Sequence, residues 1–174
     1  PHCSFDTSQM QAYLTEEARR CGAVVQTDEA GNILATKGAP QVCLQAHYDM
    51  VCMGDATHVE VVENNGFLEA KNASLGADNG MGVAMMLAAL EECDDLECLF
   101  TNDEEVGLLG ANALALSLQS PCLLNLDSEE EGKVFVGCAG GVDIAATLPL
   151  ETQEAPKDEL FYEIEVTNIP GGDT

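Results

Sequence analysis

Apolar and polar positions in the middle of the chain form short apolar runs separated by helical patterns. The runs Val42–Ala46, Leu96–Thr101 and Cys122–Leu126 have the length of buried strands. Residues 81–92, rich in Gly, Ala and Met, predict a helix that can pack closely against a sheet, and a second helix is predicted over 108–118. Strands that alternate with helices predict an α/β fold in which helices cover a central sheet.

The flanking segments predict further elements. Apolar residues recur at helical spacing from Met10 to Cys21, and Gly22 ends that helix. Val24–Thr27 and Asn32–Thr36 predict a β-hairpin. Because hairpins are antiparallel, the sheet is expected to be mixed. Further short strands are expected at Val59–Val62, Phe67–Ala70, Val134–Cys138, Val142–Leu148 and Leu160–Thr167.

Composition limits the class of protein and its partners. The chain has 174 residues, of which 46% are hydrophobic and 21% charged, as is typical of a globular domain with a sizeable core. Its 31 acidic and 6 basic residues give a net charge of −25. This charge argues against nucleic acid and membrane surfaces as partners, because phosphate binding needs clustered Lys and Arg. Most of the acidic side chains are expected to be solvated surface groups.

The cysteines and the apolar runs indicate where the protein resides. The eight cysteines include no CxxC pair, and Cys43 and Cys122 lie in apolar runs, where cysteine acts as a small buried hydrophobic side chain. A chain with this much core does not need disulfides, so a reducing, cytoplasmic location is expected. The sequence shows no signal peptide, and its longest nearly apolar run, 81–90, is too short to span a membrane. Since the chain starts at Pro1, an upstream segment is expected.

Residues of the types that bind metals follow each of the three buried strands and also open the helix at 81–92. They are His47, Asp49, Asp78, Glu104, Glu105 and Asp127. Ligands of open α/β sheets bind beyond the carboxyl ends of the strands, so these side chains are expected to converge. One histidine with several carboxylates suits zinc, for which cobalt or manganese can substitute.

The spacing of these residues suggests a division of roles. Asp78 stands in a Gly-rich turn that lets metals approach closely, so it is the natural bridge between two ions. Asp49 can orient the imidazole of His47. One of the adjacent residues Glu104 and Glu105 can hold a metal while the other faces a reacting water. Each motif alone also has a simpler interpretation, as a core histidine beside an exposed acid, a helix cap or a solvated loop pair.

Short motifs occur in a fixed order over nearly the whole chain. They are Pro1–Ser4, Gly31–Leu34, Leu44–Val51, Leu75–Gly80, Asp103–Gly107 with Gly110-Ala111, Asn125–Gly132 and Gly137–Gly141. In these motifs the chain resembles the catalytic domain of the zinc-dependent exopeptidases, the family that includes aminoacylase and carboxypeptidase G. Within that family it is most similar to the branch of aminoacyl-histidine dipeptidases.

The resemblance implies a fold, a domain division and a metal site. The fold would be a three-layer α/β sandwich with a mixed central sheet, of which this chain forms the N-terminal part. Residues 1–160 would form an incomplete catalytic domain, and residues 161–174 would begin a lid or dimerisation domain or its connection. Two zinc ions are implied. His47 and Asp127 would bind one ion, Glu105 the other, and Asp78 would bridge the two.

The resemblance also implies a reaction and its participants. Glu104 would be the general base that takes a proton from the metal-activated water, and Asp49 would orient His47. The substrates would be dipeptides, with a broad preference that includes Xaa-His, and the lid domain would allow a homodimer.

Alternative functions stay open at this point. A related amidohydrolase, such as a deacylase or carboxypeptidase, would share the site and differ in the lid. A non-catalytic fragment that binds metal weakly is the second alternative, because the family's remaining zinc ligand is a C-terminal histidine and no histidine follows His58. The third alternative is a plain acidic cation-binding protein. Its signature would be Ca²⁺-binding loops with alternating Asp or Asn and a Gly, and the sequence contains none.

Overall fold

A computed structural model of the chain describes residues 2–55, 58–128, 130, 132–137, 147–149 and 167. The chain divides into two compact units, Pro1–Glu131 and Gly132–Thr174. Every helix and strand assigned among the described residues lies in the first unit. None of the described helices is both long enough and apolar enough to cross a membrane.

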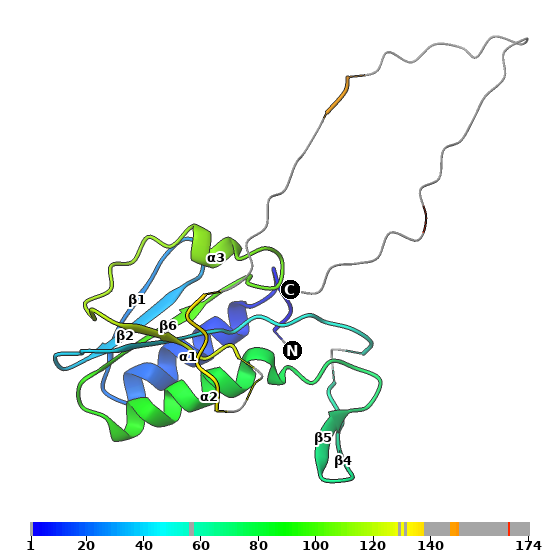
Figure 1. Cartoon of the computed structure of the whole chain (residues 1–174), viewed down its shortest axis with the longest axis horizontal. Helices are drawn as coiled ribbons and strands as arrows, with labels where there is room; N and C mark the ends of the chain where they lie inside the picture. Colours follow the sequence, from blue (N-terminus) through cyan, green and yellow to red (C-terminus); the bar gives the residue numbers. More distant parts are fainter. Residues whose placement is uncertain are drawn as a thin grey trace, which may run out of the picture. The chain divides into compact units, whose positions relative to one another are not determined.

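A mixed five-stranded sheet forms the centre of the first unit (Figure 1). Its order is β1 (Val24–Thr27), β2 (Ile33–Lys37), β6 (Leu96–Thr101), β3 (Cys43–His47) and β7 (Leu123–Asn125). The pairs β1–β2 and β2–β6 are antiparallel, whereas β3 is parallel to both β6 and β7. The prediction of an α/β fold with a mixed sheet is therefore confirmed.

Two helices, α1 (Ser8–Arg20) and α2 (Ala77–Glu92), cover one face of this sheet and pack side by side (Figure 1). The core beneath them is fully apolar at its centre. Leu14 of α1 and Leu90 of α2 are completely buried, as is Phe100 of β6. Each such side chain contributes roughly 1.5–3 kcal/mol through removal of its apolar surface from water.

The opposite face carries a short helix, α3 (Leu109–Asn112), followed by an extended segment. Leu114, Leu116 and Leu118 of that segment pack on the buried residues Leu34, Cys43 and Leu99. The helix predicted over 108–118 is thus wrong beyond residue 112. Apolar residues at every second position place their side chains on one side of an extended chain, not of a helix.

A small hairpin stands apart from the main sheet. Its strands are β4 (Val61–Asn64) and β5 (Phe67–Ala70). The turn residues Asn65 and Gly66 both have positive φ, at 51° and 85°. That conformation is the one that two-residue hairpin turns require, and an Asn-Gly pair adopts it readily. The first strand lies two residues later than predicted, because the turn sets the register.

Most other boundaries agree with the sequence-based prediction within one residue. The α2 helix begins at Ala77, four residues before the predicted start, and Asp78 and Asn79 within it are not helical in φ and ψ. The strand predicted over Val134–Cys138 is absent from its described residues, 134–137. The strands predicted at Val142–Leu148 and Leu160–Thr167 fall almost wholly outside the described residues.

The cysteines differ from expectation in two respects. Cys3 and Cys52 form a disulfide that closes a sequence separation of 49 residues. It forms because the N-terminal segment pairs with Met50 next to the loop that carries Cys52, a long-range pairing with no signature in the sequence. Cys43 is a buried free thiol, as predicted, but Cys122 is exposed because it precedes a short strand at the sheet edge.

Candidate metal centre

The carboxyl ends of the parallel strands place the predicted ligands at one edge of the sheet. His47 is the last residue of β3 and pairs in register with Thr101, the last residue of β6. Asp127 follows the end of β7 by two residues. Because β3 lies between β6 and β7, side chains that follow any of these strands come close to His47. The predicted convergence is present in the structure.

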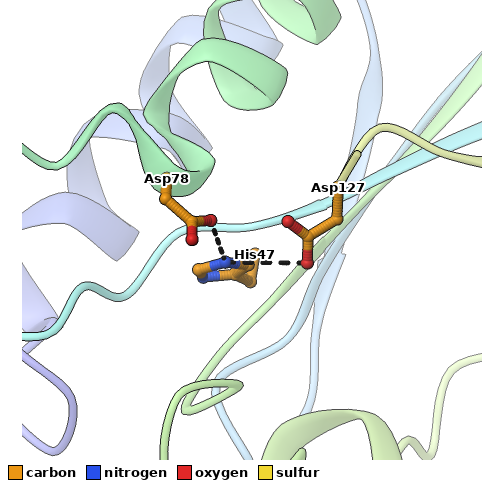
Figure 2. A group of neighbouring side chains, drawn as sticks. All are labelled: His47, Asp78 and Asp127. Atoms are coloured by element: carbon orange, nitrogen blue, oxygen red, sulfur yellow. Dashed lines mark hydrogen bonds and ion pairs between the residues drawn. The ribbon is translucent and has the colours of Figure 1, made fainter. Parts of the chain in front are cut away.

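The imidazole of His47 lies at the centre of a group of carboxylates (Figure 2). Its Nε2 atom is 3.1 Å from Asp78 Oδ1, at the start of α2, and 3.8 Å from Asp127 Oδ2. Both carboxylates point towards the ring from opposite sides (Figure 2). Glu104 Oε2 lies 3.9 Å from the same nitrogen.

Two sets of potential ligand atoms result, and the atoms within each set lie within 4.8 Å of one another. One set contains His47, Asp78 and Asp127, and the other contains His47, Glu104 and Glu105. The structure therefore brings the predicted ligands together. Their individual roles, as a ligand, bridge or base, stay predictions.

Asp49 lies beneath the centre and is completely buried. Its backbone carbonyl oxygen is 3.0 Å from His47 Nδ1, and its Oδ1 atom is 3.3 Å from the same nitrogen. A carbonyl oxygen can only accept a hydrogen bond, so Nδ1 carries the hydrogen. The lone pair of neutral His47 is then on Nε2, which faces the carboxylates of Asp78 and Asp127.

The side chain of Asp49 has a second function that the sequence did not reveal. Its Oδ1 accepts a hydrogen bond from the Glu104 N–H at 2.9 Å, and its Oδ2 accepts one from the Glu105 N–H at 3.3 Å. The hydroxyl of Ser4 also donates to Oδ2, at 2.8 Å. One buried carboxylate thus connects the histidine, the glutamate pair and the N-terminal segment.

The electrostatics of the centre follow from burial and from these contacts. Burial disfavours the charged imidazole, but Asp49, Asp127 and Asp78 outweigh it and raise the pKa of His47 to about 9. Burial also disfavours the Asp49 carboxylate, but its hydrogen-bond donors lower its pKa to about 2. Burial raises the pKa of Glu104 above its usual value. A cation, either a proton or a metal ion, is therefore strongly favoured at His47 Nε2.

A polar network holds the loop that carries the glutamates. Asn32 Nδ2 donates to the Gly110 carbonyl at 2.8 Å, and the Asn102 N–H donates to Asn32 Oδ1 at 3.3 Å. Gly110 is needed here because a Cβ atom would lie 2.2 Å from the Asn102 carbonyl oxygen. Asn32 and Gly110 belong to the sequence motifs, but no local pattern indicates that they hold this loop.

A cavity of about 240 Å³ lies next to the carboxylates of Glu104 and Asp127. Its polar lining includes Gln45 and Asn125, whose side chains form a chain of hydrogen bonds to Thr101. The sequence offered one signal for these residues, namely polar side chains inside apolar strands. Their neighbours in the sheet could not be read from the sequence.

Comparison with known proteins adds independent information. The model of peptidase family M28 matches residues 30–155. The cytosol non-specific dipeptidase of Escherichia coli is 35% identical over an alignment 192 positions long, which covers 99% of this chain and 40% of the dipeptidase. The chain thus spans less than half the length of this relative.

Solved structures with a similar fold are also peptidases. An aminoacylhistidine dipeptidase from Vibrio alginolyticus has a TM-score of 0.68 at 35% identity. The match covers 76% of this chain and 31% of the dipeptidase. A tripeptidase from Staphylococcus aureus has a TM-score of 0.65 at 25% identity, and the match covers 74% of this chain and 40% of the tripeptidase. The resemblance inferred from the sequence motifs is confirmed.

Proposed function

The chain belongs to peptidase family M28, and from this premise we propose that it supplies the metal ligands and the general base of a metal-dependent dipeptidase. The substrates would be dipeptides of broad type, including Xaa-His, as the names of the two dipeptidase relatives suggest. One observation carries the proposal. His47 Nε2 faces carboxylate oxygens of Asp78, Asp127 and Glu104 at 3.1–3.9 Å, which leaves an electron-rich centre suited to a cation.

The donor set fits zinc, with cobalt or manganese as substitutes. An imidazole nitrogen with several carboxylates is a typical zinc environment, and a buried acid beneath the histidine fixes the nitrogen that faces the metal. In our proposal His47 and Asp127 hold one ion, Glu105 holds a second and Asp78 binds both. When bound, the ions lower the pKa of a water molecule so that it ionises near neutral pH.

Glu104 is proposed as the general base. Its carboxylate would receive a proton from the attacking water and return it to the amine that leaves the cleaved peptide. Burial raises the pKa of Glu104, which makes the carboxylate a better proton acceptor near neutral pH. Asp49 would keep His47 oriented and would fix the backbone of the glutamate pair.

The test is Glu104→Gln in the full-length protein, assayed with zinc on a panel of dipeptides and N-acylated amino acids. We expect hydrolysis to fall by about 10³-fold because the amide cannot accept the proton, with metal content near that of the wild type. Glu92→Gln, on the exposed end of α2, is the matched control and should retain activity. Wild-type turnover by Glu104→Gln would overturn the assignment.

The same panel separates the alternatives. Preferential hydrolysis of acylated amino acids would favour a deacylase of the same site design. Hydrolysis by the full-length protein but not by residues 1–174 would indicate that the chain alone is a non-catalytic metal-binding fragment.

We also propose residues 1–160 as the catalytic domain and residues 161–174 as the start of a lid through which a homodimer forms. A monomeric mass for the full-length protein by light scattering would contradict the dimer. A cytoplasmic location is proposed from the name of the cytosolic relative. Cell fractionation tests the location, and recovery of the protein with the markers of an oxidising compartment would contradict it.

A further inference from the structure

The N-terminal segment, residues 2–5, lies across the strand ends that carry the metal centre. Cys3 forms a parallel bridge with Met50, in which the Met50 N–H donates to the His2 carbonyl at 3.1 Å and the Ser4 N–H donates to the Met50 carbonyl at 3.2 Å. The Phe5 N–H donates to Asp103 Oδ1 at 2.7 Å. These hydrogen bonds connect the N-terminal segment with the end of β3 and with the loop after β6.

This docking places a single hydroxyl on the buried acid beneath the centre. Ser4 Oγ donates to Asp49 Oδ2 at 2.8 Å, a shorter hydrogen bond than those from the Glu104 and Glu105 N–H groups to that carboxylate. The remaining contact of Oδ2 is the longer one, to the Glu105 N–H at 3.3 Å. Rotation about the Cβ–Cγ bond of aspartate has a broad energy profile, so the orientation of the carboxylate depends on its hydrogen-bond donors.

The orientation of the Asp49 carboxylate in turn determines where the glutamate pair lies. Both of its oxygens accept backbone N–H groups of that pair, at Glu104 and Glu105. A rotated carboxylate would release one or both amides, and the Glu104 carboxylate would then move relative to His47. The chain of contacts therefore runs from Ser4 through Asp49 to the two glutamates.

We propose that Ser4 is a positioning residue of the metal centre, which acts through the Asp49 carboxylate on the backbone of Glu104 and Glu105. The inference rests on the proposed function, in which Glu104 is the base and Glu105 a metal ligand. The described hydrogen bonds that link Ser4 to Glu104 and Glu105 run through Asp49. Loss of its hydroxyl should therefore affect the rate of the chemical step more than the binding of substrate.

The first test compares Ser4→Ala with wild type in the full-length protein. Positioning contacts of this kind change metal affinity or activity by about 10–100-fold, so we expect kcat to fall about tenfold with KM within about twofold. Ser117→Ala removes an exposed hydroxyl elsewhere and should leave both constants unchanged. Unchanged kcat in Ser4→Ala would overturn the proposal.

The second test does not require activity. Hydrogen exchange of the metal-free protein should show faster exchange at the amides of Glu104 and Glu105 in Ser4→Ala, with the strand amides of β3 and β6 unchanged. The proposal would be overturned if the Glu104 and Glu105 amides exchanged at the wild-type rate in Ser4→Ala. It would also be overturned if the amides of β3 and β6 exchanged faster as well. This measurement keeps its meaning if the wild-type protein hydrolyses no dipeptide, an outcome that would refute the proposed function alone.

A third test uses two other variants, in case Ser4→Ala does not fold. Ser4→Thr and Ser4→Val have nearly the same shape and differ in the hydroxyl. We expect glutamate-amide exchange and kcat near wild type in Ser4→Thr and altered values in Ser4→Val. Identical behaviour of the two variants would overturn the role of the hydroxyl.

Discussion

The two halves of the metal centre differ in how firmly the fold holds them. The buried half, His47 and Asp49, is 1% and 0% exposed and lies at the end of β3, a strand paired on both sides. The exposed half has side chains that are 61% exposed at Asp78 and 31% at Asp127. These come from the start of a helix and from the loop after the edge strand. We infer that the fold forms the buried half without metal, whereas the exposed half depends on metal for its final arrangement.

The largest effect that would test this comparison is expected for Asp49→Ala. It removes the acceptor of three hydrogen bonds from Ser4, Glu104 and Glu105, and it also removes the acidic partner of His47. The loss of one partner from such a buried group costs about 3–5 kcal/mol. Denaturant unfolding of the metal-free protein should show this decrease in the free energy of unfolding. A change below about 1 kcal/mol would show that the buried half is not structural.

A smaller effect is expected when the disulfide is removed by Cys3→Ser with Cys52→Ser. The bond closes a 49-residue separation that includes β3 and the end that carries His47. Its loss should lower the free energy of unfolding by about 2–4 kcal/mol, because the unfolded chain gains conformational freedom. Thermal unfolding with and without a thiol reductant measures the difference, and reduced wild type should match the double variant. Equal midpoints for the double variant and the oxidised wild type would contradict the prediction.

The smallest change in stability is expected for Asp78→Ala in the exposed half. The side chain is mostly solvated, so unfolding of the metal-free protein should change by no more than about 0.5 kcal/mol. Metal content should nevertheless fall from the proposed two zinc ions to one or fewer, because the proposed bridge is lost. Elemental analysis measures this. Two zinc ions per chain in the variant would refute the bridging role, and a large loss of stability would refute the distinction between the halves.

The sequence predicted the elements whose signal is local. The strand Leu96–Thr101 was predicted at its observed bounds, because an uninterrupted apolar run of that length is typical of a central strand. The turn at Asn65-Gly66 shows the limit of such reasoning, since the hairpin was expected but its first strand shifted by two residues. The prediction of a helix over the leucines at 114–118 is wrong, because they recur at every second position, which is the period of an extended chain.

The sequence predicts which residues form the candidate site, because residues that follow parallel strands must meet at one edge of the sheet. Its supporting contacts were not predictable. The hydrogen bond between Ser4 and Asp49 joins residues 45 positions apart, and the disulfide of Cys3 spans 49. Such contacts depend on how the N-terminal segment docks on β3, and neither partner carries a local pattern that identifies the other.

The strand order also has a consequence for the assembly of the protein during synthesis. In the described sheet β7 pairs only with β3, and it is the last of the described strands in the order of synthesis. His47 and Glu104 can therefore reach their places in a nascent chain before Asp127 has been translated. Because β7 is the last strand of the described sheet in the sequence, Asp127 joins His47 and Glu104 only after the rest of that sheet has been synthesised. A chain stalled before residue 127 would contain His47 and Glu104 but lack the carboxylate of Asp127.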